Sequence, residues 1–92
     1  MAKNYTLWLF RKAGEPIDVD YATKIQDARK KAYEVIKMGP NGSVVYILED
    51  NAKYGTGEVG KVSKNSRYRN GSIIWQPKDG EIYYLRPNGT IA

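Results

Sequence analysis

Residues 21–40 read YATKIQDARKKAYEVIKMGP, and this stretch decides the fold class. A helix turns by about 100° per residue, which gathers the apolar side chains of residues 21–38 into one stripe and sets the charged ones opposite. The stripe consists of Tyr21, Ile25, Ala28, Ala32, Val35 and Ile36. Its two alanines favour a close approach to a sheet, and residues 39–40 (GP) are a strong helix stop. The pattern predicts one amphipathic helix over residues 21–38.

Two features near the start of this helix are open to more than one interpretation. Asp20 and Thr23 are both candidate N-caps, and residues 23–26 (TKIQ) fit the capping-box pattern. Arg29 falls by helical angle inside the apolar arc. We expect its side chain to reach along the helix to water or to pair with Asp18 or Asp20, because an unpaired buried charge is costly. A role in binding is the alternative.

The other apolar runs are short and have the composition of strands. Residues 5–11 (YTLWLFR) are apolar on both faces, as in a central strand. Residues 77–80 (PKDG) separate two apolar runs, which is a strong hairpin signal. We predict strands over residues 5–11, 43–49, 58–63, 72–76 and 81–86. Residues 1–92 are therefore predicted to form a single α+β domain in the order β-α-β-β-β-β, with one helix packed on a four- to five-stranded, mostly antiparallel sheet.

Composition limits the chemistry that the chain is able to perform. Its 92 residues, 41% of them hydrophobic and 27% charged, carry a net charge of +5 and suit one small globular domain. The absence of cysteine and histidine excludes disulfides, thiolate metal sites and the usual general base at neutral pH. The acidic residues are scattered, and no two of them have an independent reason to converge. We therefore expect no enzymatic activity, no metal and no cofactor.

The sequence also bears on the compartment of the protein. The apolar run of residues 7–10 is shorter than the roughly 7–15 residues of a signal-peptide core. No run approaches the roughly 18 apolar residues of a membrane span. With no cysteine to oxidise, we expect a cytoplasmic protein without membrane contact.

Residues 55–62 (GTGEVGKV) match the spacing G-x-x-x-x-G-K of a phosphate-binding loop and also contain G-x-G-x-x-G. Such a loop needs a helix directly after it, so that backbone amides and the helix dipole face the phosphate. Val62 stands where a Ser or Thr would hold Mg²⁺, and residues 61–71 show no helical stripe. We therefore interpret the segment as a glycine-rich turn that leads into an edge strand.

Excess positive charge is concentrated in residues 51–70. That segment holds five cations and one anion, a net charge of +4, while the rest of the chain has ten cations and nine anions. Its cations are interleaved with tyrosines, which suits single-stranded nucleic acid because bases stack on rings and cations follow phosphates. The candidate nucleic-acid-binding residues are Lys53, Tyr54, Lys61, Lys64, Arg67, Tyr68 and Arg69. The alternative is a solvated loop beside a sheet edge that lysines protect against aggregation.

Aromatic residues are numerous, with eight Tyr, two Trp and one Phe, and most occupy strand positions. A single helix covers one face of a sheet, so some rings on the other face should be exposed. The candidate interaction face consists of Trp8, Phe10, Tyr46, Trp75, Tyr83 and Tyr84. Residues 5–11 and 43–49 are apolar on both sides, so the sequence leaves open which face is exposed.

These patterns favour a small non-enzymatic interaction module. We expect it to bind a protein partner or itself, for instance as a homodimer, through an aromatic sheet face or an edge strand. The alternative hypothesis is a nucleic-acid-binding module that uses the basic residues between 53 and 69. Salt separates the two, because counterion release makes nucleic-acid binding weaken steeply with salt, whereas an aromatic protein interface tolerates it.

Overall fold

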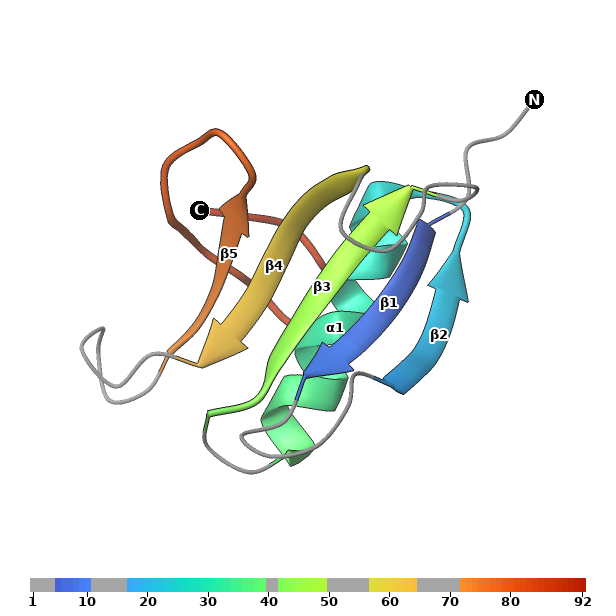
Figure 1. Cartoon of the computed structure of the whole chain (residues 1–92). Coiled ribbons are helices and arrows are strands. Elements are labelled where there is room, and N and C mark those ends of the chain that lie inside the picture. The colour runs from blue at the N-terminus through green and yellow to red at the C-terminus, as the bar shows by residue number, and fades with distance from the viewer. Residues whose placement is uncertain (1–4, 11–16, 40–41, 50–56, 65–71) are drawn as a thin grey trace.

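A computed structural model describes residues 5–10, 17–39, 42–49, 57–64 and 72–92 of the chain (Figure 1). The strands form one six-stranded sheet in the order β2-β1-β3-β4-β5-β6, every neighbouring pair is antiparallel, and helix α1 crosses one face. The elements are β1 (Tyr5–Phe10), β2 (Ile17–Ala22), α1 (Ile25–Met38), β3 (Val44–Glu49), β4 (Glu58–Lys64), β5 (Ile73–Pro77) and β6 (Tyr83–Tyr84). The predicted α+β architecture, one helix on an antiparallel sheet, is confirmed with one strand more than expected.

The additional strand is β2, where the sequence analysis placed no strand. It pairs with β1 from Leu9↔Ile17 to Tyr5↔Ala22, with a bulge beside Leu7. This pairing keeps the backbone extended through Ala22, so α1 begins at Ile25 and not at residue 21. The N-cap is Lys24, and no side chain makes a capping hydrogen bond there. The predictions that the helix starts at residue 21 and is capped by Asp20 or Thr23 are therefore wrong.

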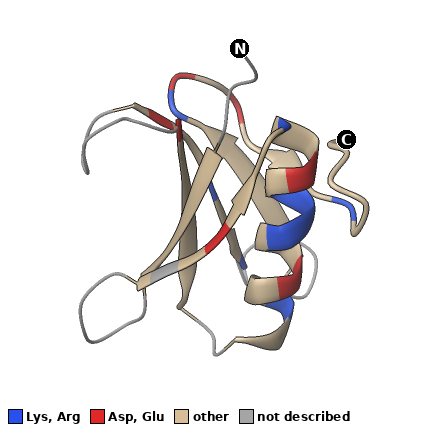
Figure 2. Ribbon diagram, turned by 90° about the vertical axis from the view of Figure 1, so that its right-hand side faces the viewer, with Lys and Arg blue, Asp and Glu red and all other residues tan. Residues whose placement is uncertain are grey.

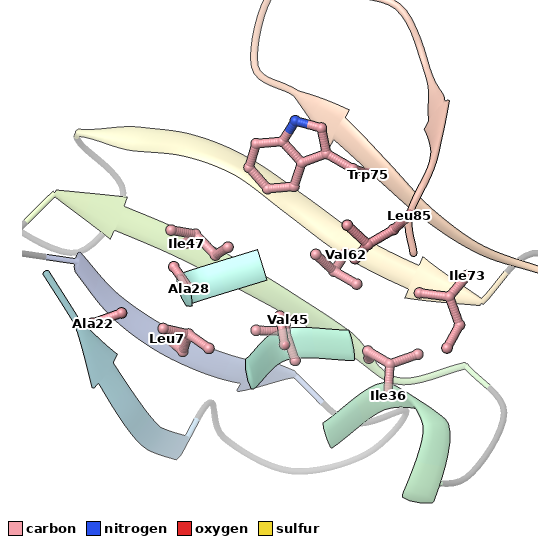
Figure 3. Close-up of a cluster of buried hydrophobic side chains, with 11 residues drawn as sticks. Leu7, Ala22, Ala28, Ile36, Val45, Ile47, Val62, Ile73, Trp75 and Leu85 are labelled. Carbon is pink, nitrogen blue, oxygen red and sulfur yellow. The ribbon is translucent and has the colours of Figure 1, made fainter. Parts of the chain in front are cut away.

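The core lies between α1 and the middle strands of the sheet (Figure 3). Ala28 and Ala32 of α1 are fully buried, and Ile36 is 1% exposed. Because alanine side chains are short, the helix lies close to the sheet, as the two alanines in the apolar stripe predict. The facing strands β1, β3 and β4 contribute Leu7, Val45, Ile47 and Val62. Burying an aliphatic side chain of this size contributes about 1.5–3 kcal/mol to folding.

The predicted hairpin between β5 and β6 is present, and a second tight turn follows it. The amide of Gly89 donates to the carbonyl of Arg86 at 2.9 Å, and the amide of Arg86 donates to the carbonyl of Thr90 at 2.9 Å. Gly89 has a φ of 90°, a left-handed conformation that favours glycine. Leu85 and Ile91 form a β-bridge beyond the turn. The last residues of the chain therefore fold back along β6.

A glycine in β4 makes room for the largest side chain of the core. Trp75 of β5 is 3% exposed, and its indole lies over Gly60 in the neighbouring strand. A Cβ built on Gly60 would lie 2.6 Å from Cζ2 of Trp75 and 2.8 Å from the carbonyl oxygen of Gln76. Real Cβ atoms essentially never make contacts this short. Gly60 therefore leaves the space that the indole fills.

We predict that Gly60→Ala lowers the free energy of unfolding by about 1–3 kcal/mol, because the new methyl group overpacks the core against Trp75. Urea denaturation followed by circular dichroism measures the change. In a Trp75→Leu background the same substitution should cost less, because the contact with the indole is gone and only the contact with the carbonyl of Gln76 remains. Ser63→Ala, on the other face of β4, is the control. If Gly60→Ala stabilised the wild type, as it does at open strand positions, the close packing would be contradicted.

Candidate functional site

Two of the seven candidate nucleic-acid-binding residues lie in the described part of the chain. Lys61 and Lys64 belong to β4, and the other candidates, Lys53, Tyr54, Arg67, Tyr68 and Arg69, lie outside the described residues. Lys61 is in register with Tyr46 on the face away from α1, and Lys64 is in register with Ile73 on the helix side. Because these two lysines lie on opposite faces of the sheet, they do not form one charged patch.

The six candidate aromatic residues divide between the two faces of the sheet. Trp75 and Tyr83 belong to the core under α1. The other four alternate with core residues along their strands and lie on the opposite face: Trp8, Phe10, Tyr46 and Tyr84. Trp75 is 3% exposed, so its assignment to an exposed face is wrong. The reason is the period of two along a strand, which turns Trp75 toward the helix.

The face away from α1 carries a packed aromatic surface with one lysine. Cross-strand register sets Trp8, Tyr46, Lys61 and Gln76 side by side. The ring of Phe10 meets the ring of Tyr46 edge-on, with centroids 4.7 Å apart and planes at 67°, a favourable arrangement for two rings. All five side chains are half-buried. The surface therefore combines aromatic rings with a positive charge.

Arg29 holds the C-terminal turn against the helix. Its Nε donates to the carbonyl oxygen of Gly89 at 2.8 Å, and its guanidinium carbon lies 5.5 Å from the centroid of the Trp75 ring. Burial lowers the pKa of Arg29 from its usual value. Beside it, the side-chain amide of Gln26 donates to the carbonyl of Asn88 at 3.2 Å. The positive charge of Arg29 is therefore stabilised by the ring of Trp75 and the carbonyl oxygen of Gly89.

The most exposed apolar side chains include three residues of β2, one of them, Val19, at the bulge opposite β1. Ile17 is 43% exposed, Val19 36% and Tyr21 60%. β2 ends the sheet, and among the described residues its only strand partner is β1. An exposed apolar edge strand is a template for pairing with another chain. The β2 edge, defined here as residues 17–22, therefore has the properties of a binding surface.

One residue of the β2 edge has its peptide groups covered by charged side chains. The amide of Tyr21 donates to Oδ1 of Asp20 at 2.8 Å. Nζ of Lys31, from α1, donates to the carbonyl oxygen of Tyr21 at 2.6 Å and lies 3.4 Å from the same carboxylate oxygen. We call this arrangement of Asp20 and Lys31 on Tyr21 the clasp. It occupies the hydrogen-bonding groups that an added strand would use.

A groove of about 710 Å³ runs between the β2 edge and α1. Its lining residues are Tyr21, Ala22, Thr23, Asp27, Lys30, Lys31 and Glu34. Figure 2 shows the corresponding surface of the helix, where blue and red segments alternate. A strand added to the β2 edge would direct side chains into this groove where it passes Tyr21 and Ala22, because side chains alternate between the two faces of a sheet.

The glycine motif in residues 55–62 does not form a phosphate cradle with a helix behind it. Residues 58–64 are strand β4, which continues the antiparallel sheet. Gly60 in this motif accommodates Trp75. The motif therefore has a structural explanation in its described part, and its first two residues lie outside the described range.

Among the described residues, no three acidic side chains lie together in a way that could hold a metal ion. The one helix among these residues is too short and too polar to cross a membrane.

No protein-family model, curated protein or solved structure matches this chain.

Sequence reasoning missed the β2 edge and the clasp. The signal for the strand is present, because residues 17–21 alternate apolar and acidic side chains (IDVDY). This signal is obscured because Gly14 and Pro16 before it are typical of a turn and Asp20 is a candidate helix N-cap. The clasp has no sequence signal, since Lys31 and Asp20 meet only once the strand and helix pack together.

We predict that Arg29→Met lowers the free energy of unfolding by about 1–3 kcal/mol, because it leaves the carbonyl of Gly89 without its charged donor. Arg29→Lys should recover little of this loss, since an ammonium lacks the planar group that lies over Trp75. Lys30→Met is the matched control, because Lys30 is exposed and has no hydrogen bond to another described residue. Its free energy of unfolding should stay within about 0.5 kcal/mol of the wild type. Equal effects of Arg29→Met and Lys30→Met in urea denaturation would count against this role.

Proposed function

We propose that this chain is a small non-enzymatic binding module that takes up an extended segment of a partner protein along the β2 edge. The observation that carries the proposal is the exposed apolar edge strand beside a groove. In such strand addition, main-chain hydrogen bonds supply affinity and pockets for alternate side chains supply specificity. The β2 edge offers main-chain hydrogen bonds, and the groove between the β2 edge and α1 offers a pocket for side chains. The proposal keeps the cytoplasmic location expected from the cysteine-free sequence.

Charge favours a partner with basic side chains. β2 contains Asp18 and Asp20 and no cation, although the chain as a whole carries a net charge of +5. Pairing two copies through the β2 edge would bring the Asp20 side chains of both copies into one short strand pair, which is unfavourable. A segment with lysine or arginine would meet complementary charge instead. We therefore propose a basic extended peptide segment as the occupant, in preference to a second copy of the chain.

The β2 edge is a better binding surface than the aromatic face. Tyr21, Val19 and Ile17 are each at least 36% exposed. Trp8, Phe10 and Tyr46 are only half-buried, but Phe10 and Tyr46 already pack against each other. Binding at the edge uses backbone groups and apolar side chains together, whereas the aromatic face offers side chains alone.

We predict that random peptides selected on the immobilised protein are enriched in extended sequences with lysine or arginine at alternate positions. Amide NMR shifts on adding such a peptide should map to residues 17–22 and to the groove side of α1. Tyr21→Pro removes the outward amide of the β2 edge and should weaken binding about tenfold or more, because main-chain pairing is lost. Tyr21→Ala keeps the amide and should weaken binding less than Tyr21→Pro, because only the side-chain contact is lost.

The controls separate loss of binding from loss of folding. Circular dichroism melting establishes whether Tyr21→Pro is folded, and Val19→Lys blocks the edge by a second route, because edge lysines oppose strand pairing. Selected peptides that bind Tyr21→Pro and Val19→Lys as well as the wild type would contradict the proposal. So would shifts confined to Trp8, Phe10 and Tyr46, or a selection that enriches no peptide.

A second candidate function is binding of single-stranded nucleic acid on the face away from α1. The observation that favours it is the position of Lys61 beside Tyr46, with Trp8 next in the same row. Rings that stack on bases and a cation that meets a phosphate are the two components of such a surface. The surface has only one lysine among the described residues, which is why we place this candidate second.

For this candidate we predict that a short single-stranded oligonucleotide shifts the amides of Trp8, Tyr46 and Lys61 at about 50 mM salt and much less at about 200 mM. Lys61→Glu should weaken the binding, because the phosphate contact becomes repulsive. Lys78→Glu, which makes the same charge change in the exposed β5–β6 turn, is the control. Equal effects of the two variants, or no shifts at low salt, would rule out this face.

A further inference from the structure

We infer that the clasp closes the β2 edge in the free protein and that a basic side chain of the incoming strand opens it by replacing Lys31 on Asp20. This inference rests on the proposed function and adds a specificity rule to it. The occupant must supply a lysine or arginine at the position that faces Asp20. The groove and the apolar edge alone would accept any extended apolar segment.

The peptide groups of Tyr21 point to the outer edge of the sheet. The amide of Glu49 donates to the carbonyl of Gly57 beside β4 at 3.0 Å, so the peptide groups of Glu49 face β4. Alternation along β3 turns those of Leu48 toward β1, where Leu48 is in register with Thr6. Thr6 is also in register with Tyr21. Because the peptide groups of Thr6 face β3, those of Tyr21 point away from β1, to the outer edge.

The clasp imitates an added strand. In an antiparallel pair, one residue of the neighbouring strand accepts from an amide and donates to the carbonyl of the same residue. For Tyr21 the carboxylate of Asp20 accepts from the amide and the ammonium of Lys31 donates to the carbonyl. The edge is thereby satisfied without a partner, which protects it against unspecific pairing.

A basic strand replaces the interactions that Tyr21 and Asp20 make in the clasp. Its backbone takes over the amide and carbonyl of Tyr21, which sets free the carboxylate of Asp20 and the ammonium of Lys31. Leu7 lies in the core beneath α1 and is in register with Asp20, so Asp20 is on the groove side of the sheet. A lysine or arginine on that side of the incoming strand restores the ion pair with Asp20. An acidic side chain would meet Asp20 with a like charge.

The clasp is weak enough for an incoming strand to displace it. The side chains of Lys31 and Asp20 are 41% and 44% exposed, so water screens their ion pair. Once released, the ammonium of Lys31 can be hydrated at the rim of the groove beside Glu34. The exchange therefore trades one exposed ion pair for another, while the apolar contacts of the strand supply the net affinity.

The test uses two capped octapeptides, one of alternating valine and lysine and one of alternating valine and glutamate. We expect the lysine peptide to bind the wild type and the glutamate peptide to bind much more weakly. Lys31→Met should raise the affinity for the lysine peptide about two- to fivefold, the size expected for one exposed ion pair that no longer has to be broken. Lys37→Met makes the same charge change at an exposed position of α1 outside the groove, and it should bind the lysine peptide as tightly as the wild type.

Asp20→Asn tests the other half of the clasp. It should remove most of the preference for the lysine peptide over the glutamate peptide, because the carboxylate that selects the cation is gone. The affinities are measured by isothermal titration, and circular dichroism establishes that each variant is folded. Retention of the full preference by Asp20→Asn would overturn the specificity rule.

The outcomes distinguish the clasp from the binding site itself. If the lysine peptide binds the wild type and is lost in Tyr21→Pro, but Lys31→Met weakens or does not change binding, the clasp is wrong and the proposed function stands. If the lysine peptide binds neither the wild type nor Lys31→Met, the proposed function fails with it. A concentration-dependent dimer of Lys31→Met in light scattering would identify a second copy as the occupant and would overturn the basic partner.

Discussion

A single helix lies over a six-stranded sheet, and this geometrical constraint determines which surfaces the protein offers. α1 has 14 residues, which is about 21 Å of helix with a diameter of about 10 Å. Six strands spaced about 4.8 Å apart extend over about 24 Å, so a helix that crosses them covers only part of the face. The core residues under α1 come chiefly from the middle of the sheet (Figure 3). The two flanks need other cover.

The two flanks are covered by different means. Toward β5, the indole of Trp75 fills the space that Gly60 leaves, and Arg29 joins that indole to the turn at Gly89. Toward β2, Lys31 of α1 donates a hydrogen bond to the carbonyl of Tyr21, and a groove remains between the helix and the strand. The flank toward β5 is part of the core, because Trp75 buries a large apolar side chain there. The flank toward β2 depends on exposed charges and is the place where another chain can be accommodated.

Sequence patterns identified the parts of this structure that depend on local chemistry. The apolar stripe with Ala28 and Ala32 predicted which side of the helix is buried, and residues 77–80 predicted the hairpin. β2 was missed because its aspartates resemble turn residues, although edge strands commonly carry charge. The partner of Arg29 could not be predicted, since Gly89 lies 60 positions away in the chain. The burial of Trp75 could not be predicted either, because the space for its indole is left by Gly60 in another strand.

The two edges of the sheet are closed in ways that differ in permanence. At β6 the chain folds back on itself, and the amide of Ala92 donates to the carbonyl of Tyr84 at 2.9 Å. At β2 the peptide groups of Tyr21 are covered by the side chains of Asp20 and Lys31. Backbone closure is tied to the fold, since opening it would release the turn that Arg29 holds. Side-chain closure can be exchanged without disturbing the core, because neither Asp20 nor Lys31 belongs to it. An edge protected in this second way can remain unpaired in the free protein and still accept a strand that brings the matching charge.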